Sequence, residues 1–295
     1  MEYKLSNNHL TLSVKGQGAE VVSLLTRCGS QLIWTADPAY WNRHSPLLFP
    51  CVGGNWNGMI QVGGRSFSLP KHGFVQDAAF EIAGKTSESS VTFQYSENED
   101  TLKMYPFPFR LSVCYTLCDH TIGVKWRIEN HGDTPMPFMI GGHPAFLLPQ
   151  FEENETVHAY LRFPEVDELL STPTLPNGFA HTDKTERFPL TDHLLPLTNT
   201  TFLCDTILDT TGRIHEVQLL DKHKKNILVV KFQSPVLALW APCGGASPFV
   251  CVEPWFGCCD NEGYNGEFSD RQHVQNAPAK GLWTGGYEIT ISEDV

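Results

Sequence analysis

Two ionisable residues, His143 and Glu253, stand in apolar stretches marked by glycine and proline, and each is followed directly by proline. His143 lies in the segment IGGHPAF and Glu253 in the segment FVCVEPWFG. A following proline keeps the preceding residue out of the helical region and on extended backbone. An imidazole and a carboxylate held in this way, with Trp255 beside the carboxylate, could form a proton-transfer pair over a sugar ring.

Each of these residues also has a structural interpretation. A carboxylate between Val252 and Pro254 is costly to bury without a partner, so Glu253 is either catalytic or one half of a buried ion pair. A His-Pro pair at the end of a strand is commonly structural. Trp255 is a core aromatic on one interpretation and a platform for the C–H face of a sugar on the other. The residues alone leave these alternatives open.

Three further residues are candidates for a binding site. His72 precedes glycine in LPKHGF, where the missing side chain lets backbone or ligand approach closely; the alternative is a turn histidine bonded to backbone. Asp205 interrupts what we expect to be an apolar strand in FLCDTIL, and it is otherwise a solvent-facing position. Arg43 precedes the apolar patch SPLLFP, and it is otherwise a surface cation.

The elements that must position these residues are predicted to be strands. Apolar residues alternate with polar ones in several segments, with the period of two that strands require; these segments are 9–15, 91–95, 109–117, 122–128, 217–220, 227–230 and 287–291. Helical signals are few, and we expect at most one turn at Val166–Leu170. Without a linker or repeat, the pattern predicts an all-β chain, a large antiparallel β-sandwich in which residues 1–295 form a single domain.

Composition narrows the class of protein. The net charge of −12 argues against a nucleic-acid or anionic membrane surface and favours a small-molecule ligand. The N-terminal residues lack a signal-peptide pattern, and no apolar run approaches about 18 residues, so we expect a cytoplasmic protein. Nine cysteines without metal-ligand spacing are expected to be reduced thiols, with no metal site. The chain lacks GxGxxG, Walker A, GxSxG and HExxH motifs.

Five segments, taken in order, resemble the aldose 1-epimerase (galactose mutarotase) superfamily, and more narrowly its bacterial branch of uncertain substrate. The similarity runs along nearly the whole chain, and the segments are SPLLFP with Val52-Gly53, then KHGF, YPFPFRL, GGHPAF and VEPW. The resemblance implies a β-supersandwich of the galactose mutarotase type that interconverts the anomers of a free sugar without a cofactor. It implies that Glu253 is the general base and His143 the general acid. It further implies that His72, Asp205 and Arg43 bind the substrate.

In this chemistry His143 must carry a proton and Glu253 must not. A histidine ordinarily titrates near pH 6.5, and we expect the nearby carboxylate to favour its charged form. Relatives often carry an arginine after the apolar Phe-Pro segment and Ala-Arg-Asp after His-Gly-Phe, whereas this chain has Gly53-Gly54-Asn55-Trp56 and Val75-Gln76-Asp77. Two cations are therefore missing, and we expect a neutral aldose as substrate.

Three alternatives stay open at this stage. The first is a hexose-6-phosphate 1-epimerase, which Arg43, Lys71 and Arg110 would serve if they converged on one rim. The second is a non-catalytic carbohydrate-binding or sugar-sensing protein on the same scaffold. The third is a glycoside hydrolase, which needs a second carboxylate at about 5–10 Å from Glu253. The sequence determines neither the sugar nor the oligomeric state.

Overall fold

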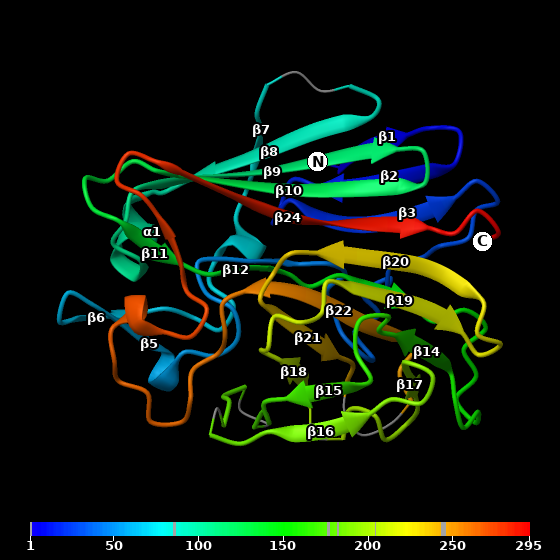
Figure 1. Ribbon diagram of the computed structural model, residues 1–295. Helices are drawn as coiled ribbons and strands as arrows, with labels where there is room; N and C mark the ends of the chain where they lie inside the picture. The colour runs from blue at the N-terminus through cyan, green and yellow to red at the C-terminus, as the bar shows by residue number, and fades with distance from the viewer. Residues whose placement is uncertain (1, 85–86, 176–177, 182, 204, 243–245) are drawn as a thin grey trace.

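The computed structural model describes residues 2–84, 87–175, 178–181, 183–203, 205–242 and 246–295 (Figure 1). Within these residues nearly all of the regular secondary structure is antiparallel strand, arranged in two large sheets and three small ones. The predicted all-β sandwich is confirmed. None of the helices in the described part of the chain combines the length and the apolar character of a membrane span.

The larger sheet has nine strands, and its long members run side by side in the upper part of Figure 1. In spatial order these strands are β17 (Leu194–Leu197), β14 (Ala159–Arg162), β19 (Glu216–Asp221), β20 (Asn226–Phe232), β24 (Leu282–Ile291), β10 (Thr121–Asn130), β9 (Phe109–Cys118), β8 (Ser90–Ser96) and β7 (Glu81–Ile82). The alternation that predicted β9 and β10 is visible in their burial, because every second side chain lies in the core. The tip predicted between β19 and β20 is a tight turn at residues 222–225.

The second sheet has eight strands and carries the residues of interest. In order they are β16 (Glu186–Pro189), β15 (Glu168–Ser171), β18 (Ile207–Asp209), β21 (Val236–Trp240), β22 (Phe249–Phe256), β12 (Ile140–Gly142) and β4 (Leu47–Leu48), and β13 (Ala145–Leu147) also pairs with β22. The small sheets are β1 (Glu2–Ser6), β2 (Leu10–Lys15) and β3 (Glu20–Thr26); β5 (Met59–Val62) and β6 (Arg65–Ser68); and β11 (Met136–Phe138) and β23 (Gln275–Ala277).

The two large sheets pack face to face. Phe256 at the end of β22 contacts Trp126 of β10 and Trp283 of β24, with ring centroids 6.3 and 5.1 Å apart. Gly142 of β12 lies under Tyr287 of β24, whose ring occupies the space that a Cβ would need. Most of the buried apolar side chains, from both sheets, form one continuous core. The single-domain organisation of residues 1–295 stays a prediction, which this shared core supports.

Helical structure is scarce and differs from the sequence-based expectation. The turn expected at Val166–Leu170 was wrong, because residues from Glu168 onward form β15 between β16 and β18. The one described α-helix is α1 (Glu99–Met104), which the sequence analysis missed. Asn98 caps it by accepting hydrogen bonds from the backbone of Asp100 and Thr101, a signal that was present in the sequence. Short 3-10 turns occur at Trp56–Gly58, Val75–Asp77 and Phe268–Asp270.

Candidate functional site

Strand β22 places Glu253 on the face of its sheet that points away from the nine-stranded sheet. Side chains alternate along a strand, so Glu253 lies on the face opposite to Phe256, which contacts the other sheet. On the neighbouring strand β21, Ala238 is the register partner of Glu253. The small side chain of Ala238 leaves room beside the carboxylate. Glu253 is nevertheless only 1% exposed, because loops cover this face of the sheet.

His143 lies in the short link between β12 and β13, directly beside Glu253. Its Nε2 atom is 3.2 Å from Oε2 of Glu253. Its ring stacks on Trp41, with centroids 4.7 Å apart and an angle of 26° between the planes. The backbone N–H of His143 donates to Pro46 O at 3.1 Å, which ties the link to the loop that carries Trp41. The imidazole is thus held by a parallel ring and by its own backbone.

Polar atoms of this pair are left without partners among the described residues. Glu253 Oε2 and His143 Nδ1 are buried and form no hydrogen bond with described residues, although Oε2 lies within ion-pair distance of the imidazole. Buried polar groups are normally satisfied, so an unsatisfied pair in a pocket marks a position where a ligand can supply the missing bonds. A sugar, with its many hydroxyl groups, could do so.

Burial sets the proton affinities of both groups. It raises the pKa of Glu253 well above its ordinary value, and the nearby positive charge of Lys71 opposes that rise. Burial also lowers the pKa of His143 to about 3. The expectation that the carboxylate would hold His143 in its charged form was therefore wrong for the ligand-free pocket, because the cost of burying charge dominates. Both shifts favour the neutral form of each group, a protonated carboxyl beside an uncharged imidazole.

His72 occupies a turn whose backbone is left-handed, with φ +64°, and it faces the same pocket. Its Nδ1 accepts a hydrogen bond from the backbone N–H of Gly53 at 3.1 Å. Burial holds the pKa of His72 well below its ordinary value. The ring is therefore neutral, and because Nδ1 is the acceptor, the proton is on Nε2. His72 is a turn histidine bonded to backbone, as one interpretation predicted. It also lines the pocket, and its role in binding substrate stays a prediction.

Asp205 reaches the pocket from the opposite side. The expectation that it interrupts a strand was wrong, since it lies in a turn with φ +73° and β18 begins only at Ile207. Aspartate tolerates this conformation better than most residues. Its Oδ1 accepts a hydrogen bond from Trp240 Nε1 at 2.9 Å, which orients the carboxylate. Cys204, which precedes it in the sequence motif, lies outside the described residues.

Arg43 lies at the rim and is already paired. Its guanidinium forms two hydrogen bonds to the Asp77 carboxylate, at 3.1 and 3.0 Å, so its charge is largely balanced there. Gln76 lines the same side of the pocket. Lys71 also lines the pocket and forms no ion pair with any other residue that the structure describes. Of the two cations among the described residues that line the pocket, Lys71 is therefore the one whose charge is available to interact with a ligand.

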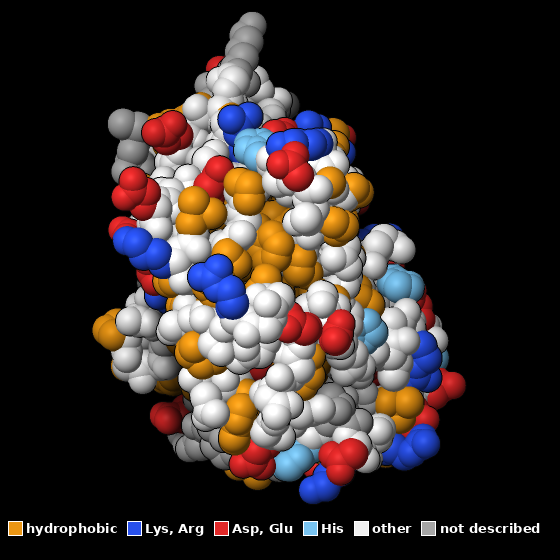
Figure 2. Space-filling model, turned by 90° about the vertical axis from the view of Figure 1, so that its left-hand side faces the viewer, with side chains coloured by type: hydrophobic (Ala, Val, Ile, Leu, Met, Phe, Trp, Pro, Cys, Tyr) orange, Lys and Arg blue, Asp and Glu red, His pale blue; other side chains and the backbone are white. Residues whose placement is uncertain are grey.

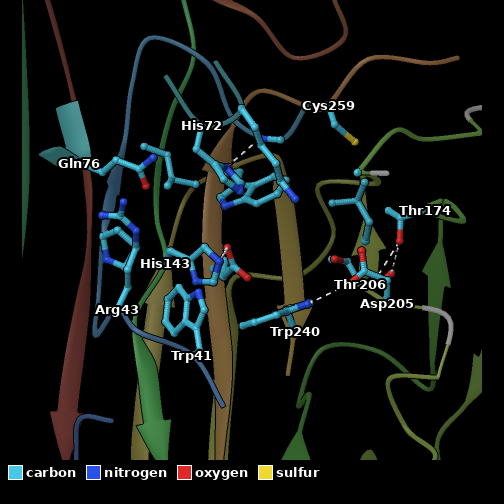
Figure 3. A pocket seen from close by; sticks show the side chains of 18 residues that line it. Trp41, Arg43, His72, Gln76, His143, Thr174, Asp205, Thr206, Trp240 and Cys259 are labelled. Atoms are coloured by element: carbon cyan, nitrogen blue, oxygen red, sulfur yellow. Dashed lines mark hydrogen bonds and ion pairs between the residues drawn. The ribbon is translucent and has the colours of Figure 1, made fainter. Parts of the chain in front are cut away.

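All six predicted site residues line one cavity of about 410 Å³, which is within the usual range for small-molecule sites. Figure 3 shows Arg43 and Gln76 on one side, Asp205, Thr206 and Thr174 on the other, and the two histidines between them. Trp255 contributes little exposed surface, since it is 5% exposed and packs over Gly141. The sequence thus identified the charged groups of one pocket, although it could not show that they meet.

Two aromatic residues of the pocket were missed, Trp41 and Trp240. Both are partly exposed, and their rings meet at a centroid distance of 5.4 Å and an angle of 66°. Both indole rings also contact the imidazole of His143, so the three rings form one aromatic cluster beside Glu253. A signal was available for Trp41, which stands two residues before Arg43. Trp240 lies in a strand that the sequence analysis did not single out, and nothing nearby in the sequence marks it.

One group of side chains in the described part of the chain could hold a metal ion. Ligand atoms of His143, Cys251 and Glu253 lie within 4.8 Å of one another. Burial raises the pKa of Cys251 well above its ordinary value, so its thiol is protonated in the ligand-free protein. The seven described cysteines are all free thiols; Cys204 and Cys243 lie outside the described residues.

Comparisons with known proteins show the family of this chain and the solved structures that it resembles. The family model described as "Aldose 1-epimerase" matches residues 1–277. Protein LacX (chromosomal) of Lactococcus lactis subsp. lactis is 30% identical over 303 aligned positions, which cover 99% of each chain. A galactose mutarotase related enzyme from Lactobacillus acidophilus superposes with a TM-score of 0.90 at 27% identity, covering 99% of this chain and 98% of that one. A galactose mutarotase-like protein from Lactobacillus casei ATCC 334 gives 0.91 at 25% identity, covering 99% and 100%.

Proposed function

This chain belongs to the aldose 1-epimerase family, and on that premise we propose that it interconverts the α and β anomers of a free aldose by acid–base ring opening. Glu253 is the base and His143 the acid. The observation that carries the proposal is the placement of these two groups side by side, 3.2 Å apart, with Glu253 Oε2 left without a hydrogen bond among the described residues.

The chemistry of mutarotation matches this spacing. The two oxygens that exchange protons, the C1 hydroxyl and the ring oxygen, are bonded to the same carbon, so the acid and the base must lie next to each other. Glu253 takes the C1 hydroxyl proton while His143 protonates the ring oxygen. The ring opens to the aldehyde, rotation about C1–C2 presents the other carbonyl face, and closure reverses the two roles. A glycoside hydrolase instead needs two carboxyl groups about 5 Å or more apart, flanking the bond.

One shared proton is enough for this reaction. In the empty pocket that proton is on Glu253, and both groups are neutral. Its transfer from Glu253 Oε2 to His143 Nε2 produces the ionised base and the charged acid without any exchange with solvent. The hydroxyl groups of a bound sugar replace lost solvation, and the charge of Lys71 favours the ionised carboxylate. Substrate binding therefore shifts the pair to its reactive form.

The remaining residues bind the sugar in this proposal. The Nε2–H of His72 donates to a substrate oxygen, and Asp205 accepts from hydroxyl groups. Trp41 and Trp240 offer apolar surface to the C–H face of the ring, a role that the sequence analysis assigned to the more buried Trp255. We propose a neutral aldose such as glucose or galactose, because Arg43 is engaged by Asp77.

A second candidate is a hexose-6-phosphate 1-epimerase. The observation in its favour is Lys71, which lines the pocket without an ion pair to any described residue. A single lysine acts as a point charge, however, whereas phosphate sites usually combine several cations or backbone donors. We therefore place this activity second.

The test is a two-dimensional NMR exchange experiment at anomeric equilibrium, run with glucose, galactose, other aldoses and hexose 6-phosphates. Enzyme-dependent exchange between anomers is the expected result with at least one neutral aldose. Binding without accelerated exchange for every sugar would show a carbohydrate-binding protein instead. The assay includes excess EDTA, and a loss of exchange that zinc restores would show that His143, Cys251 and Glu253 hold a metal.

A further inference from the structure

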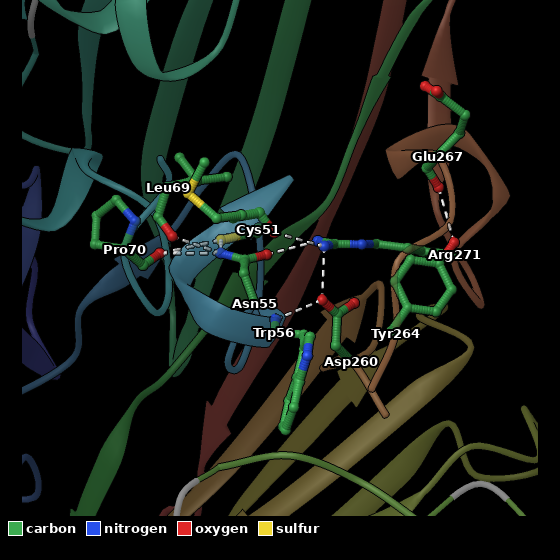
Figure 4. Close-up of polar contacts among 10 residues, drawn as sticks. Cys51, Asn55, Trp56, Leu69, Pro70, Asp260, Tyr264, Glu267 and Arg271 are labelled. Atoms are coloured by element: carbon green, nitrogen blue, oxygen red, sulfur yellow. Dashed lines mark hydrogen bonds and ion pairs between the residues drawn. The ribbon is translucent and has the colours of Figure 1, made fainter. Parts of the chain in front are cut away.

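Arg271, Asp260 and Asn55 form a buried polar cluster next to the pocket but do not line it (Figure 4). Arg271 donates from Nη2 to Asp260 Oδ2 at 2.6 Å and from Nη1 to Asn55 Oδ1 at 2.5 Å. The three residues are 7%, 4% and 4% exposed. The rings of Tyr264 and Phe268 lie against the guanidinium, 5.4 and 4.8 Å from its carbon.

This cluster joins segments that are distant in the sequence. Asp260 follows β22, the strand that carries Glu253, and its Oδ2 also accepts from the backbone N–H of Trp56 at 2.8 Å. The amide of Asn55 donates from Nδ2 to Leu69 O at 2.9 Å and to Pro70 O at 3.3 Å. One guanidinium therefore connects the end of β22 to the 53–56 loop, and through Asn55 to the segment that leads into His72.

The 53–56 loop holds the ring of His72. Gly53 donates its backbone N–H to His72 Nδ1, and the backbone N–H of His72 donates back to Gly53 O at 3.0 Å. Gly53 has φ +67° and packs so closely on Cys259 that an added Cβ would lie 2.3 Å from the Cys259 Cβ. The backbone N–H of Asp260 donates to Gly54 O at 3.0 Å, which gives the backbone of the 53–56 loop a further anchor to the segment after β22.

We propose that Arg271 is a positioning residue for His72, acting through Asp260 and Asn55 on the Gly53 N–H. By holding that N–H against Nδ1, the cluster keeps the proton of the imidazole on Nε2, where it faces the substrate. The proposal rests on the proposed function only in taking His72 as a substrate-binding group. No residue of the cluster touches the sugar.

A purely structural role would not require this chemistry. A buried ion pair stabilises a fold little, because the cost of removing two charges from water offsets their attraction, and apolar side chains of similar size often serve as well. The planar guanidinium does what an apolar side chain cannot, since it meets Asp260 and Asn55 together with two directed donors. The consequence is a fixed distance between the loop and β22, and hence between His72 and Glu253.

The experiment uses three variants of the full chain: Arg271→Met, Arg271→Lys and Asn55→Ala. Each is 15N-labelled at histidine, and the ring nitrogen shifts of His72 report which nitrogen carries the proton. We expect the Nε2–H form in the wild type and a mixture of tautomers in Arg271→Met and Asn55→Ala. KM for the aldose should rise about tenfold, the effect of one hydrogen bond to substrate, while kcat changes by less than about threefold. Arg271→Lys can keep one of the two contacts, to Asp260 or to Asn55. Its tautomer mixture and its KM should therefore lie between those of the wild type and of Arg271→Met.

Two controls separate positioning from loss of stability. Leu219→Ala removes a fully buried side chain in β19, on the other sheet, and should lower the melting temperature without changing the tautomer or KM. In the double variant Arg271→Met with His72→Asn, KM should rise no further than in His72→Asn alone, because both changes remove the same interaction.

An unchanged His72 tautomer in Asn55→Ala and Arg271→Lys would overturn the proposal, as would additive effects on KM in the double variant. If Arg271→Met does not fold, the other two variants carry the test by the same criteria. The tautomer is measured by NMR without turnover, and calorimetry on the same variants gives the affinity for the sugar when KM cannot be measured. A protein that lacks epimerase activity would therefore contradict the proposed function while the NMR result still decides the role of Arg271.

Discussion

In the pocket, Nε2 of His143 lies 3.2 Å from Oε2 of Glu253, and burial shifts the two pKa values in opposite directions. The imidazole becomes a weaker base and the carboxyl a weaker acid than in water. Over a wide pH range the pair therefore holds one proton, and a single transfer between two atoms converts its resting form into its reactive form.

This arrangement predicts an unusual pH profile. On acidification the reactive protonation state is lost when the neutral imidazole of His143 is itself protonated, near pH 3. It is lost on the alkaline side when pH rises through the elevated pKa of Glu253. We expect kcat/KM to stay level as pH falls from about 7 to about 5, through the ordinary histidine value of about 6.5. Polarimetry with the spontaneous rate subtracted, and circular dichroism as a check of folding, measures this. A single titration near 6.5 would contradict the shared proton.

The two histidines should give different kinetic defects. His143→Asn removes the acid and should lower kcat by about 10²–10⁴-fold, the usual contribution of a positioned acid. His72→Asn removes a donor to bound substrate and should raise KM more than it lowers kcat. Steady-state kinetics on both variants decides the assignment. If the two effects were interchanged, the roles given to His72 and His143 would have to be exchanged.

Trp41 is expected to affect catalysis by holding the imidazole ring of His143 in place. Its indole stacks on His143 with centroids 4.7 Å apart, and an aromatic pair contributes about 0.5–1.5 kcal/mol beyond its buried area. We expect Trp41→Leu to lower kcat by up to about tenfold and Trp41→Phe to retain most of the activity. Equal losses in the two variants would show that indole size, not stacking, is what the site needs.

The pairing of Arg43 with Asp77 at the rim of the pocket should make the enzyme prefer neutral sugars over sugar phosphates. Arg43 is held by Asp77, so Arg43→Gln should change kcat/KM for glucose by less than about threefold. Glucose should be preferred over glucose 6-phosphate at low ionic strength, where a cationic site would act most strongly. A tenfold preference for the phosphate, about 1.4 kcal/mol, would favour the second candidate. Loss of that preference in Lys71→Gln would then identify Lys71 as the phosphate ligand.

The sequence predicted those parts of the fold that local patterns encode. Alternation identified β9 and β10 because each has one face in the core. It failed at Val166–Leu170, where pairing with neighbouring strands determines the conformation, and no local signal reveals such pairing. The Asn98 cap of α1 was readable but lay in a chain dominated by strand signals.

The sequence pointed to most of the charged residues that line the pocket but, of its three tryptophans, only to Trp255. Glu253 stood out because a carboxylate in an apolar segment is costly to bury, and Asp205 because it was expected to interrupt an apolar strand. Trp240 could not be found in this way, because a tryptophan in an apolar strand looks like core until the fold places it opposite Asp205. The direction of the His143 pKa shift could not be predicted from the sequence either, because it depends on the burial of the imidazole in the folded chain.

The most direct test of the central claim is the rate of anomer exchange in Glu253→Gln, measured by NMR on glucose and galactose at saturating concentration. Glutamine keeps the size and hydrogen-bonding capacity of the side chain but cannot act as a base. We expect exchange to fall by about 10²-fold or more while the affinity for sugar, measured by calorimetry, changes little. Near-wild-type exchange in this variant would contradict the assignment of Glu253 as the base.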